Sequence, residues 1–231
     1  MTKILFVCHG NICRSPMAEF CLRDLCERAG VGGGFEIASA ATSTEELGNG
    51  VYPPVRRLLD ARGIDCRGKT VRLLRAADYD DYDLLIGMDA YNLRSMGRVF
   101  GADPAGKLRL LLDYAGRPGQ SVADPWYTRD FEAAWDDIAA GCEGLLGALT
   151  GAAVLDFAGC ADRGGLYAVL RRGMGWADWY GENLDALWDV LTGLPHDGRR
   201  FVLALPREAG PVRDYAERIR RLFGEAGLLA T

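Results

Sequence analysis

The sequence predicts an α/β protein in which a four-stranded parallel sheet has helices on both faces and a second, smaller α/β domain follows. Short apolar runs near residues 3–8, 35–39, 83–88 and 107–112 alternate with helix-like segments, as buried parallel strands do. An apolar stripe over residues 131–149 indicates a long amphipathic helix. About 80 residues remain after it, which is enough for another domain.

The first strand, over residues 3–8, leads through a short loop into the first helix. Ser15 is the expected N-cap of this helix and Pro16 its first residue, because serine accepts a backbone N–H there and proline lacks one. The helix pattern continues from Met17 to Ala29. The glycines that follow come after a helix instead of a strand, so we interpret them as a connector and not as a nucleotide-binding loop.

The last helix marks the end of the first domain. Its apolar residues recur every three or four positions and so share one face: Phe131, Trp135, Ile138, Cys142, Leu145 and Leu149. Gly151 is expected to end this helix. Residues 154–157 (Val-Leu-Asp-Phe) are then typical of a strand. We therefore expect two domains, 1–150 and 152–231.

The composition narrows the class of protein. Hydrophobic residues make up 49% of the chain and charged residues 26%, as in globular proteins, and no apolar run approaches the roughly 20 residues of a membrane span. The net charge of -5 gives no reason to expect nucleic acid as a partner. Seven cysteines, an odd number, and the lack of a signal-peptide pattern favour a cytoplasmic protein that does not bind membranes.

The loop after the first strand carries the strongest chemical pattern. Cys8 and Arg14 are the ends of Cys-His-Gly-Asn-Ile-Cys-Arg, so a thiol and a guanidinium flank five residues. Gly10 and Asn11 tolerate the positive φ that turns backbone N–H groups inward, and such a nest binds anions. The helix N-terminus favours a bound phosphate and the thiolate form of the cysteine. The forked guanidinium can hold two oxygens of a phosphoryl group.

A cysteine that attacks phosphorus needs an acid to protonate the departing oxygen, and residues 124–127 (Asp-Pro-Trp-Tyr) supply one. Asp124 follows the predicted fourth strand, so it is expected at the same edge of the sheet as the loop. Trp126 and Tyr127 are expected to wall a slot for a phenyl ring, with at least one of them in the core. Asp-Pro also occurs at the start of ordinary turns. Because the cysteine loop is present as well, we favour a catalytic role for Asp124 over a turn alone.

Residues 7–16 and 124–127 together resemble the low-molecular-weight protein tyrosine phosphatases, and the similarity runs over about the first 150 residues. It includes residues 39–43 and 88–89. The resemblance implies that Cys8 takes the phosphoryl group as a thiophosphate while Asp124 protonates the phenol. Asp124 would then help a water molecule to hydrolyse this intermediate. Arg14 and the loop amides would hold the transferring group, without metal or other cofactor.

The resemblance also assigns the other loop residues. Ser15 would hydrogen-bond the sulfur, Asn11 would brace the loop, and Cys13 could pair with Cys8 under oxidation. The expected substrate-binding residues are therefore His9, Gly10, Asn11, Ile12, Cys13, Ser15, Trp126 and Tyr127. A zinc site is not expected at the two loop cysteines, because the chain has only two histidines and no second cysteine pair at zinc spacing.

Two segments depart from the pattern of this family. The family often has a histidine after its second helix that orders the loop asparagine, whereas residues 68–72 (Gly-Lys-Thr-Val-Arg) have none. Loop rigidity is therefore expected to be maintained differently here. The rim segment 44–52 lacks the large aromatic residue often found there, and its acids Glu45 and Glu46 disfavour very acidic peptides.

The second domain has a distinctive stretch over residues 179–193. As a helix it buries leucines on one face and aligns Asp185 and Asp189 on another, although stacked like charges destabilise a helix slightly. A surface for binding a cation or basic partner would explain the stripe, and a solvated helix face is the simpler alternative. This stretch resembles barstar, the intracellular inhibitor of the ribonuclease barnase, and residues 223–226 match another of its segments.

The barstar resemblance implies a surface for a barnase-like ribonuclease, with Asp189 in the phosphate pocket of the nuclease. The matching residues on or beside that surface are Trp179, Asn183, Asp185, Trp188, Asp189, Thr192, Gly193 and Glu225. Barstar ends in a strand after its last helix, but only residues 228–231 remain here. The sheet of the second domain is therefore expected to have one short strand fewer than that of barstar. Arginines in the final helix leave this domain close to neutral.

The predicted function is a cysteine-dependent phosphatase for phosphotyrosine or aryl phosphate monoesters, joined to a barstar-like binding module. Three alternatives stay open. An arsenate reductase uses the same loop but needs a later cysteine pair, and only Cys66 lies in a suitable region. A phosphoarginine phosphatase carries threonine in place of Ile12. A ribonuclease inhibitor or scaffold would bind phosphate in its first domain without turnover.

Overall fold

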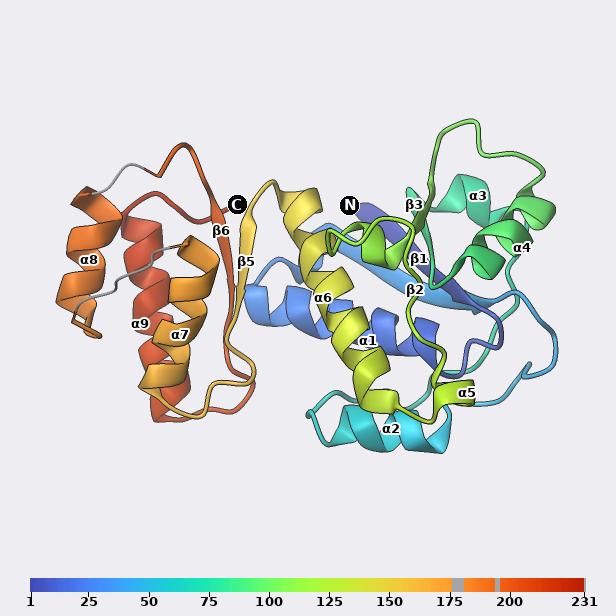
Figure 1. Cartoon of the computed structure of the whole chain (residues 1–231), viewed down its shortest axis with the longest axis horizontal. Helices are drawn as coiled ribbons and strands as arrows, with labels where there is room; N and C mark the ends of the chain where they lie inside the picture. The colour runs from blue at the N-terminus through green and yellow to red at the C-terminus, as the bar shows by residue number, and fades with distance from the viewer. Residues whose placement is uncertain (176–180, 194–195, 231) are drawn as a thin grey trace. The chain divides into compact units, whose positions relative to one another are not determined.

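The structure is a computed structural model that describes residues 1–175, 181–193 and 196–230 (Figure 1). Its strands are β1 (Thr2–Cys8), β2 (Phe35–Ala41), β3 (Leu84–Gly87), β4 (Leu108–Leu110), β5 (Ala153–Asp156) and β6 (Phe201–Ala204). Its α-helices are α1 (Arg14–Ala29), α2 (Pro53–Asp60), α3 (Asp78–Asp81), α4 (Ala90–Phe100), α5 (Pro125–Thr128), α6 (Phe131–Thr150), α7 (Arg163–Met174), α8 (Leu184–Gly193) and α9 (Pro211–Glu225). Within these described ranges, no helix is long and apolar enough to cross a membrane.

The first sheet is parallel throughout, and its strand order is β2-β1-β3-β4. The predicted four-stranded parallel sheet is therefore confirmed. The chain order reverses direction at β1, which has β2 on one side and β3 on the other. Ligands of open α/β sheets bind at such a switch point, beyond the carboxyl ends of the strands. Cys8 is the last residue of β1 and lies at that point.

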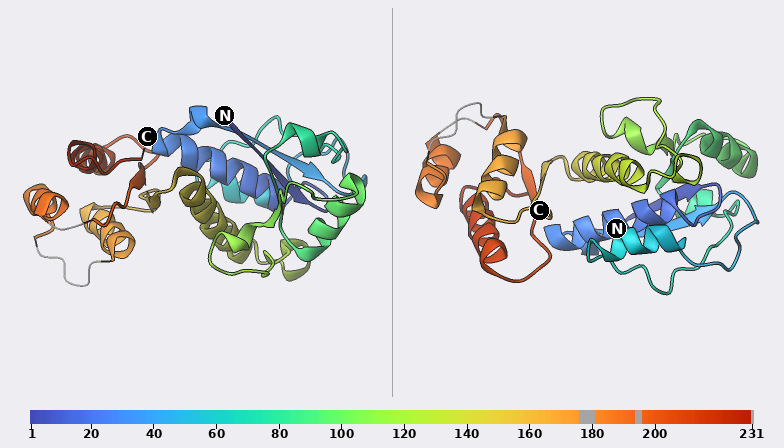
Figure 2. Two further views of the ribbon diagram at one scale, coloured as in Figure 1. Left: turned by 90° about the horizontal axis from the view of Figure 1, so that it is seen from above. Right: turned by 60° about the horizontal axis from the view of Figure 1, so that its bottom comes forward.

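Helices cover both faces of this sheet. On one face, Leu5, Val7 and Leu85 pack together with Met96 of α4. Ile4 and Phe6 alternate with these residues along β1, so their fully buried side chains lie on the opposite face. On that side lie α1 and α6, which run beside each other (Figure 1, Figure 2). Burial on both faces explains why the strands are apolar runs without alternation.

The predicted start of the first helix is wrong. Helix α1 begins at Arg14, so Ser15 lies in its first turn and is not its N-cap. The helix starts early because Asn11, with a φ of 55°, turns the chain before it. As a result, the carbonyl of Cys13 already accepts the amide N–H of Met17 at 3.1 Å. The side chain of Ser15 is thereby free to act elsewhere.

In the first sheet, β2 and β4 each end two residues away from the predicted end. β4 ends at Leu110 and not at the predicted residue 112, because residues 111–113 form a 3-10 turn. Asp113 accepts the Leu110 amide at 3.3 Å and so closes that turn. β2 continues to Ala41, which is the register partner of Cys8. β1 and β2 therefore end together at the edge of the sheet that carries the loop.

The rest of the chain forms a second α/β unit. Contacts divide the chain into Met1–Asp24 with Gly32–Leu145 and Leu25–Val31 with Leu146–Thr231. In the second unit, β5 and β6 form a parallel pair, and their apolar residues share a core with α7, α8 and α9. After α9, Leu229 makes one isolated bridge to Phe201, where a third strand would extend the sheet. Within the described residues, the sheet of this unit therefore has two strands.

Candidate functional site

The loop between β1 and α1 is held by hydrogen bonds from outside it. The carbonyls of Cys8 and His9 accept N–H groups of residues 42–43, at 3.0 Å each. The carbonyl of Ile12 accepts the N–H of Tyr52 at 2.9 Å. Carbonyls that bond outward leave N–H groups directed toward the centre of the loop. Such a concave set of N–H groups is what an anion requires.

The sulfur of Cys8 is buried and has two hydrogen-bonding neighbours. Sγ lies 3.0 Å from the Oγ of Ser15 and 3.3 Å from the backbone nitrogen of Asn11. The side-chain Nδ2 of Asn11 donates to Ser15 Oγ at 2.8 Å. Because Ser15 Oγ accepts from Asn11, its own hydrogen is available to the sulfur. This arrangement suits a negatively charged sulfur, either as a nucleophile or as a leaving group.

The predicted positive φ is found at Asn11 but not at Gly10. The φ of Asn11 is 55°, whereas Gly10 lies outside the left-handed region. A glycine at position 10 has a steric reason instead, because a Cβ there would come within 3.3 Å of Glu46 Cγ. The rim segment therefore lies close over the loop. A larger side chain at position 10 would push this rim away.

A buried network braces Asn11 from the far side of the loop. Its Nδ2 also donates to Ser39 Oγ at 2.7 Å, and Ser39 Oγ donates to the Glu19 carboxylate at 2.5 Å. Lys69 Nζ lies 2.7 Å from the same carboxylate. Loop, strand β2, helix α1 and the segment after α2 are thus joined through four polar side chains.

Arg14 has a buried guanidinium between two carboxylates. Its Nη1 lies 2.7 Å from Asp89 Oδ2, and its Nη2 lies 2.6 Å from Asp124 Oδ2. Nη1 also donates to the carbonyl of Val122 at 3.3 Å. Burial alone would lower the pKa of Arg14, but Cys8, Asp124 and Asp89 raise this pKa overall. The guanidinium therefore stays charged and has one fixed orientation.

Asp124 both caps a helix and contacts the loop arginine. Its Oδ1 accepts the N–H of Trp126 at 3.0 Å, which caps α5, while Oδ2 bonds Arg14. The turn interpretation and the functional interpretation of this Asp-Pro pair are therefore compatible. The cap fixes the carboxylate, and its side chain keeps 26% of its surface exposed to solvent at the site.

The aromatic residues after Asp124 do not lie in the core. Trp126 is 44% exposed and Tyr127 is 82% exposed, so the expectation that one of them is a core residue is wrong. The ring of Trp126 packs on Tyr52, with a centroid separation of 5.5 Å, and Tyr52 also contacts Phe131 at 6.1 Å. Tyr52, the last residue of the rim segment 44–52, was missed from the sequence. It supplies an aromatic ring from a segment that was expected to lack one.

The remaining loop residues differ in exposure. His9 is exposed and lies 3.3 Å from Glu45 of the rim. Ile12 and Cys13 are buried, and Cys13 is a free thiol, as is Cys8. Burial, together with nearby Cys8 and Asp124, raises the pKa of Cys13 to about 12, so it is a neutral thiol. In the described part of the chain, no three His, Cys, Asp or Glu side chains gather as metal ligands would.

Four other site residues were also missed as functional candidates. They are Glu19, Ser39, Lys69 and Asp89. Asp89 carried a detectable signal, because it follows β3, the neighbour of β1, and therefore emerges at the same sheet edge. The signal for the other three residues was weaker, since their partners come from segments 20 to 50 residues away in the sequence.

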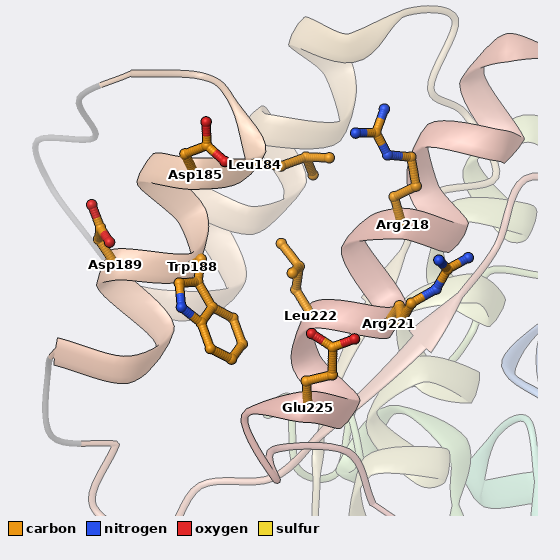
Figure 3. Close-up of a pocket in the computed structure, with 8 residues that line it drawn as sticks. All are labelled: Leu184, Asp185, Trp188, Asp189, Arg218, Arg221, Leu222 and Glu225. Carbon is orange, nitrogen blue, oxygen red and sulfur yellow. The ribbon is translucent and has the colours of Figure 1, made fainter.

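A second candidate site lies in the other unit, in a hollow of about 510 Å³ between α8 and α9 (Figure 3). The residues that line it are Leu184, Asp185, Trp188, Asp189, Arg218, Arg221, Leu222 and Glu225. Trp188 and Leu222 occupy the gap between the helices, with the aspartates of α8 on one side and the arginines of α9 on the other (Figure 3). The hollow therefore has an apolar floor and a rim of both charges.

The predicted partner-binding residues are only partly brought together. Asp185, Trp188, Asp189 and Glu225 line the hollow. Asn183 instead accepts the N–H of Ala186 at the start of α8, and Thr192 donates to the Trp188 carbonyl. Gly193 is the last residue of α8, and Trp179 lies outside the described residues. Arg218 and Arg221 were predicted to neutralise the domain but not to line this surface.

Comparison with known families gives two matches along the chain. The family described as low molecular weight phosphotyrosine protein phosphatase matches residues 3–154. The family described as barstar (barnase inhibitor) matches residues 151–226. Together they cover both predicted resemblances.

Individual relatives match the first of these regions. The low molecular weight protein-tyrosine-phosphatase YfkJ of Bacillus subtilis is 38% identical over 150 residues, which cover 64% of this chain and 96% of YfkJ. The low molecular weight phosphotyrosine protein phosphatase of Schizosaccharomyces pombe is 40% identical over 133 residues, which cover 55% of this chain and 84% of the yeast protein. The crystal structure of YfkJ aligns with a TM-score of 0.63 over 65% of this chain and 96% of that chain. The crystal structure of the low molecular weight protein tyrosine phosphatase from Streptococcus pyogenes, which is 34% identical, aligns with a TM-score of 0.57. The alignment covers 64% of this chain and 93% of that chain.

Proposed function

The chain belongs to the low molecular weight phosphotyrosine protein phosphatase family, and from this premise we propose that it hydrolyses aryl phosphate monoesters through a thiophosphate on Cys8. The observation that carries the proposal is the meeting of three groups at one sheet edge. The Cys8 sulfur faces the hydroxyl of Ser15, and the buried Arg14 behind it contacts Asp124. These groups are a nucleophile, an anion holder and an acid.

Substrate binding begins with an exchange of partners at Arg14. In the structure, the guanidinium is bound to Asp124 and Asp89. A phosphate dianion with two oxygens on the guanidinium and others on the loop N–H groups displaces Asp124 from Nη2. The second anion beside this carboxylate favours its protonated form. Binding therefore prepares Asp124 to act as an acid.

The first chemical step transfers the phosphoryl group to sulfur. The Cys8 sulfur forms a bond to phosphorus while the bond from phosphorus to the aryl oxygen breaks. Asp124 gives its proton to the departing phenolate, which leaves as a phenol. Negative charge on the equatorial oxygens is held by Arg14 and the loop amides, which are already in place before the reaction.

The second step returns the cysteine to its starting state. Asp124, now a carboxylate, accepts a proton from the attacking water as its oxygen bonds to phosphorus. The bond between sulfur and phosphorus breaks, and inorganic phosphate leaves. The hydroxyl of Ser15, 3.0 Å from the sulfur, stabilises the negative charge that returns to Cys8.

The aromatic residues at the mouth favour a flat leaving group. Tyr52 and Trp126 form one side of the entrance and are partly open to solvent. A phenyl ring packs against such side chains better than an alkyl group does. The apolar Ile12 in the loop agrees with this preference. Phosphotyrosine is therefore the proposed substrate class, ahead of phosphoarginine and arsenate.

The decisive experiment measures hydrolysis of p-nitrophenyl phosphate by the full chain and by Cys8→Ser and Asp124→Ala. We expect turnover by the wild type, loss of turnover in Cys8→Ser and a fall of about 100-fold or more in Asp124→Ala. Equal background rates for all three proteins would refute the phosphatase function. Parallel assays with phosphoarginine and with arsenate plus a thiol test whether the protein is instead a phosphoarginine phosphatase or an arsenate reductase.

We also propose that the second domain binds a protein, with a basic ribonuclease as the first candidate. The match to the barstar family supports a binding role, and the hollow between α8 and α9 supplies the surface. The test is titration of a barnase-like ribonuclease with the full chain, with Asp189→Ala as the variant and Asp214→Ala, an exposed acid outside the hollow, as the control. If the wild type does not inhibit the ribonuclease, the proposal that this domain binds a basic ribonuclease is refuted.

A further inference from the structure

We propose that Lys69 is a positioning residue for the Cys8 loop and that it acts through the buried carboxylate of Glu19. This inference rests on the proposed phosphatase function, because it concerns how the nucleophile is held. Lys69 lies in the segment after α2, remote in sequence from the loop. Its ammonium group contacts neither the sulfur nor Arg14 in the described structure.

A continuous path of hydrogen bonds connects the two places. Lys69 Nζ lies 2.7 Å from Glu19 Oε2, and Ser39 Oγ donates to that same oxygen at 2.5 Å. Ser39 Oγ accepts from Asn11 Nδ2 at 2.7 Å. Asn11 Nδ2 also donates to Ser15 Oγ, which lies 3.0 Å from Cys8 Sγ.

The path fixes which way each hydroxyl donates. A hydroxyl has one hydrogen, so Ser39, which accepts from Asn11, donates to Glu19. By the same logic Ser15, which also accepts from Asn11, has its hydrogen left for the sulfur. The orientation of the Asn11 amide therefore decides whether Cys8 receives a donor.

The Asn11 amide is held only through its NH₂ group. Its Oδ1 is buried and has no hydrogen-bond partner among the residues described. If Ser39 no longer donated to Glu19, the amide could turn and present Oδ1 to both serine hydroxyls. Ser15 would then donate to Asn11 and not to the sulfur. The carboxylate of Glu19 is what prevents this exchange.

Lys69 is the cation that pairs with Glu19 at this oxygen. Glu19 is only 2% exposed, and a carboxylate so buried requires a charged partner. The side chain of Lys69 is 12% exposed and also donates to the Ser39 carbonyl at 3.2 Å. Arg23 contacts the other oxygen, Oε1, at 3.0 Å, but its side chain is 45% exposed. Of these two cations, only Lys69 contacts Oε2, the Glu19 oxygen that accepts the hydrogen bond from Ser39.

The test compares Lys69→Met with three other variants of the full chain. Lys69→Arg keeps the charge. Arg23→Met removes the cation from the other oxygen of Glu19. Lys3→Met breaks an exposed Lys-Glu pair at the amino end of β1, with a separation of 3.3 Å, and serves as the matched control. Each is measured for kcat and KM with p-nitrophenyl phosphate, for thermal unfolding, and for the rate at which iodoacetamide alkylates Cys8.

We expect Lys69→Met to lower kcat by about 10-fold to 100-fold, the usual effect of a slightly misplaced catalytic group, with KM changed less than about threefold. Alkylation of Cys8 should slow in parallel, because the sulfur loses a donor. Lys69→Arg should recover most of both rates. Arg23→Met and Lys3→Met should stay within about twofold of wild type.

The outcomes separate this inference from the function on which it rests. The positioning role is refuted if Lys69→Met alkylates and turns over like Lys3→Met, or if it loses thermal stability while the folded protein keeps its kcat. A wild type without turnover, whose Cys8 alkylation nevertheless depends on Lys69, would refute the phosphatase function and leave the path from Lys69 intact.

Discussion

Arg14 Nη2 lies 2.6 Å from Asp124 Oδ2, so the guanidinium proposed to hold phosphate is bound to the carboxylate proposed to donate the proton. The site is therefore complementary to an anion but contains one of its own. Phosphate must displace Asp124 before it can bind to both nitrogens of the fork. Affinity for phosphate and rate of catalysis should consequently respond in opposite directions when this carboxylate is removed.

Asp124→Asn is the first test of this relationship. The amide keeps the cap on α5 but no longer competes for Arg14, so inorganic phosphate should inhibit several-fold more tightly. The same change removes the general acid, so kcat should fall by about 100-fold to 10,000-fold. Inhibition constants and kcat measured with p-nitrophenyl phosphate check both effects. Weaker phosphate inhibition in Asp124→Asn would contradict the competition, and exposed Asp65→Asn is the control.

Asp89 performs two tasks that substitutions can separate. Its Oδ1 accepts the Asn92 N–H at 2.7 Å and caps α4, while Oδ2 pairs with Arg14. Asp89→Asn preserves the cap, so it should lower kcat about 10-fold with little change in unfolding temperature. Asp89→Ala also removes the cap and should cost about 1 kcal/mol of stability in addition. Equal unfolding free energies for the two variants would show that the cap contributes nothing.

Local sequence patterns predicted the parts of the fold whose causes are local. The strand before Cys8, the loop and the helix after it follow from an apolar run, turn-tolerant residues and helical spacing. The same reasoning failed at Ser15, where a capping rule predicted a bond to the backbone. There the sulfur of Cys8, brought close by the turn at Asn11, is the partner instead.

Contacts between distant segments could not be predicted in this way. Tyr52 and Trp126 meet because the rim and α5 converge at the same sheet edge, which no local pattern indicates. Lys69 lies in the histidine-free segment 68–72, where the sequence only suggested that the loop is braced by other means. Its partner Glu19 is 50 residues earlier in the chain, on the buried side of α1. Residue types alone gave no reason to join them.

Cys13 should be much less reactive than Cys8 at neutral pH. Its pKa is raised from the ordinary 9.0 to about 12, so between pH 7 and 9 the folded protein holds it as a neutral thiol. Iodoacetamide should therefore label Cys8 first, and Cys13 labelling should rise sharply only above the upper end of that range or after unfolding. Mass spectrometry of peptides from pH 7, 8 and 9 gives the rates. Comparable labelling of both cysteines at pH 8 would contradict this prediction.

Tyr52 should contribute to the preference for aryl substrates. Because its ring supports Trp126 at the mouth, Tyr52→Ala should lower kcat/KM for p-nitrophenyl phosphate by about threefold to tenfold. The rate with a small alkyl phosphate should change less, since it has no ring to contact. Tyr91→Ala, at a 74% exposed tyrosine of α4 outside the predicted binding residues, is the control and should have little effect. A similar loss for both substrates would assign Tyr52 a general structural role.

The mixed charges around the hollow between α8 and α9 should determine which proteins bind there. Asp185 and Asp189 attract a basic surface, whereas Arg218 and Arg221 across the hollow repel it. With a barnase-like ribonuclease, Asp189→Ala should weaken binding by about 10-fold or more, and Arg221→Ala should strengthen it, most clearly at low salt. Titrations at two salt concentrations measure both changes. If both variants bind more weakly, the partner carries an acidic group facing α9 as well as a basic group facing α8. That result would exclude a uniformly basic nuclease surface.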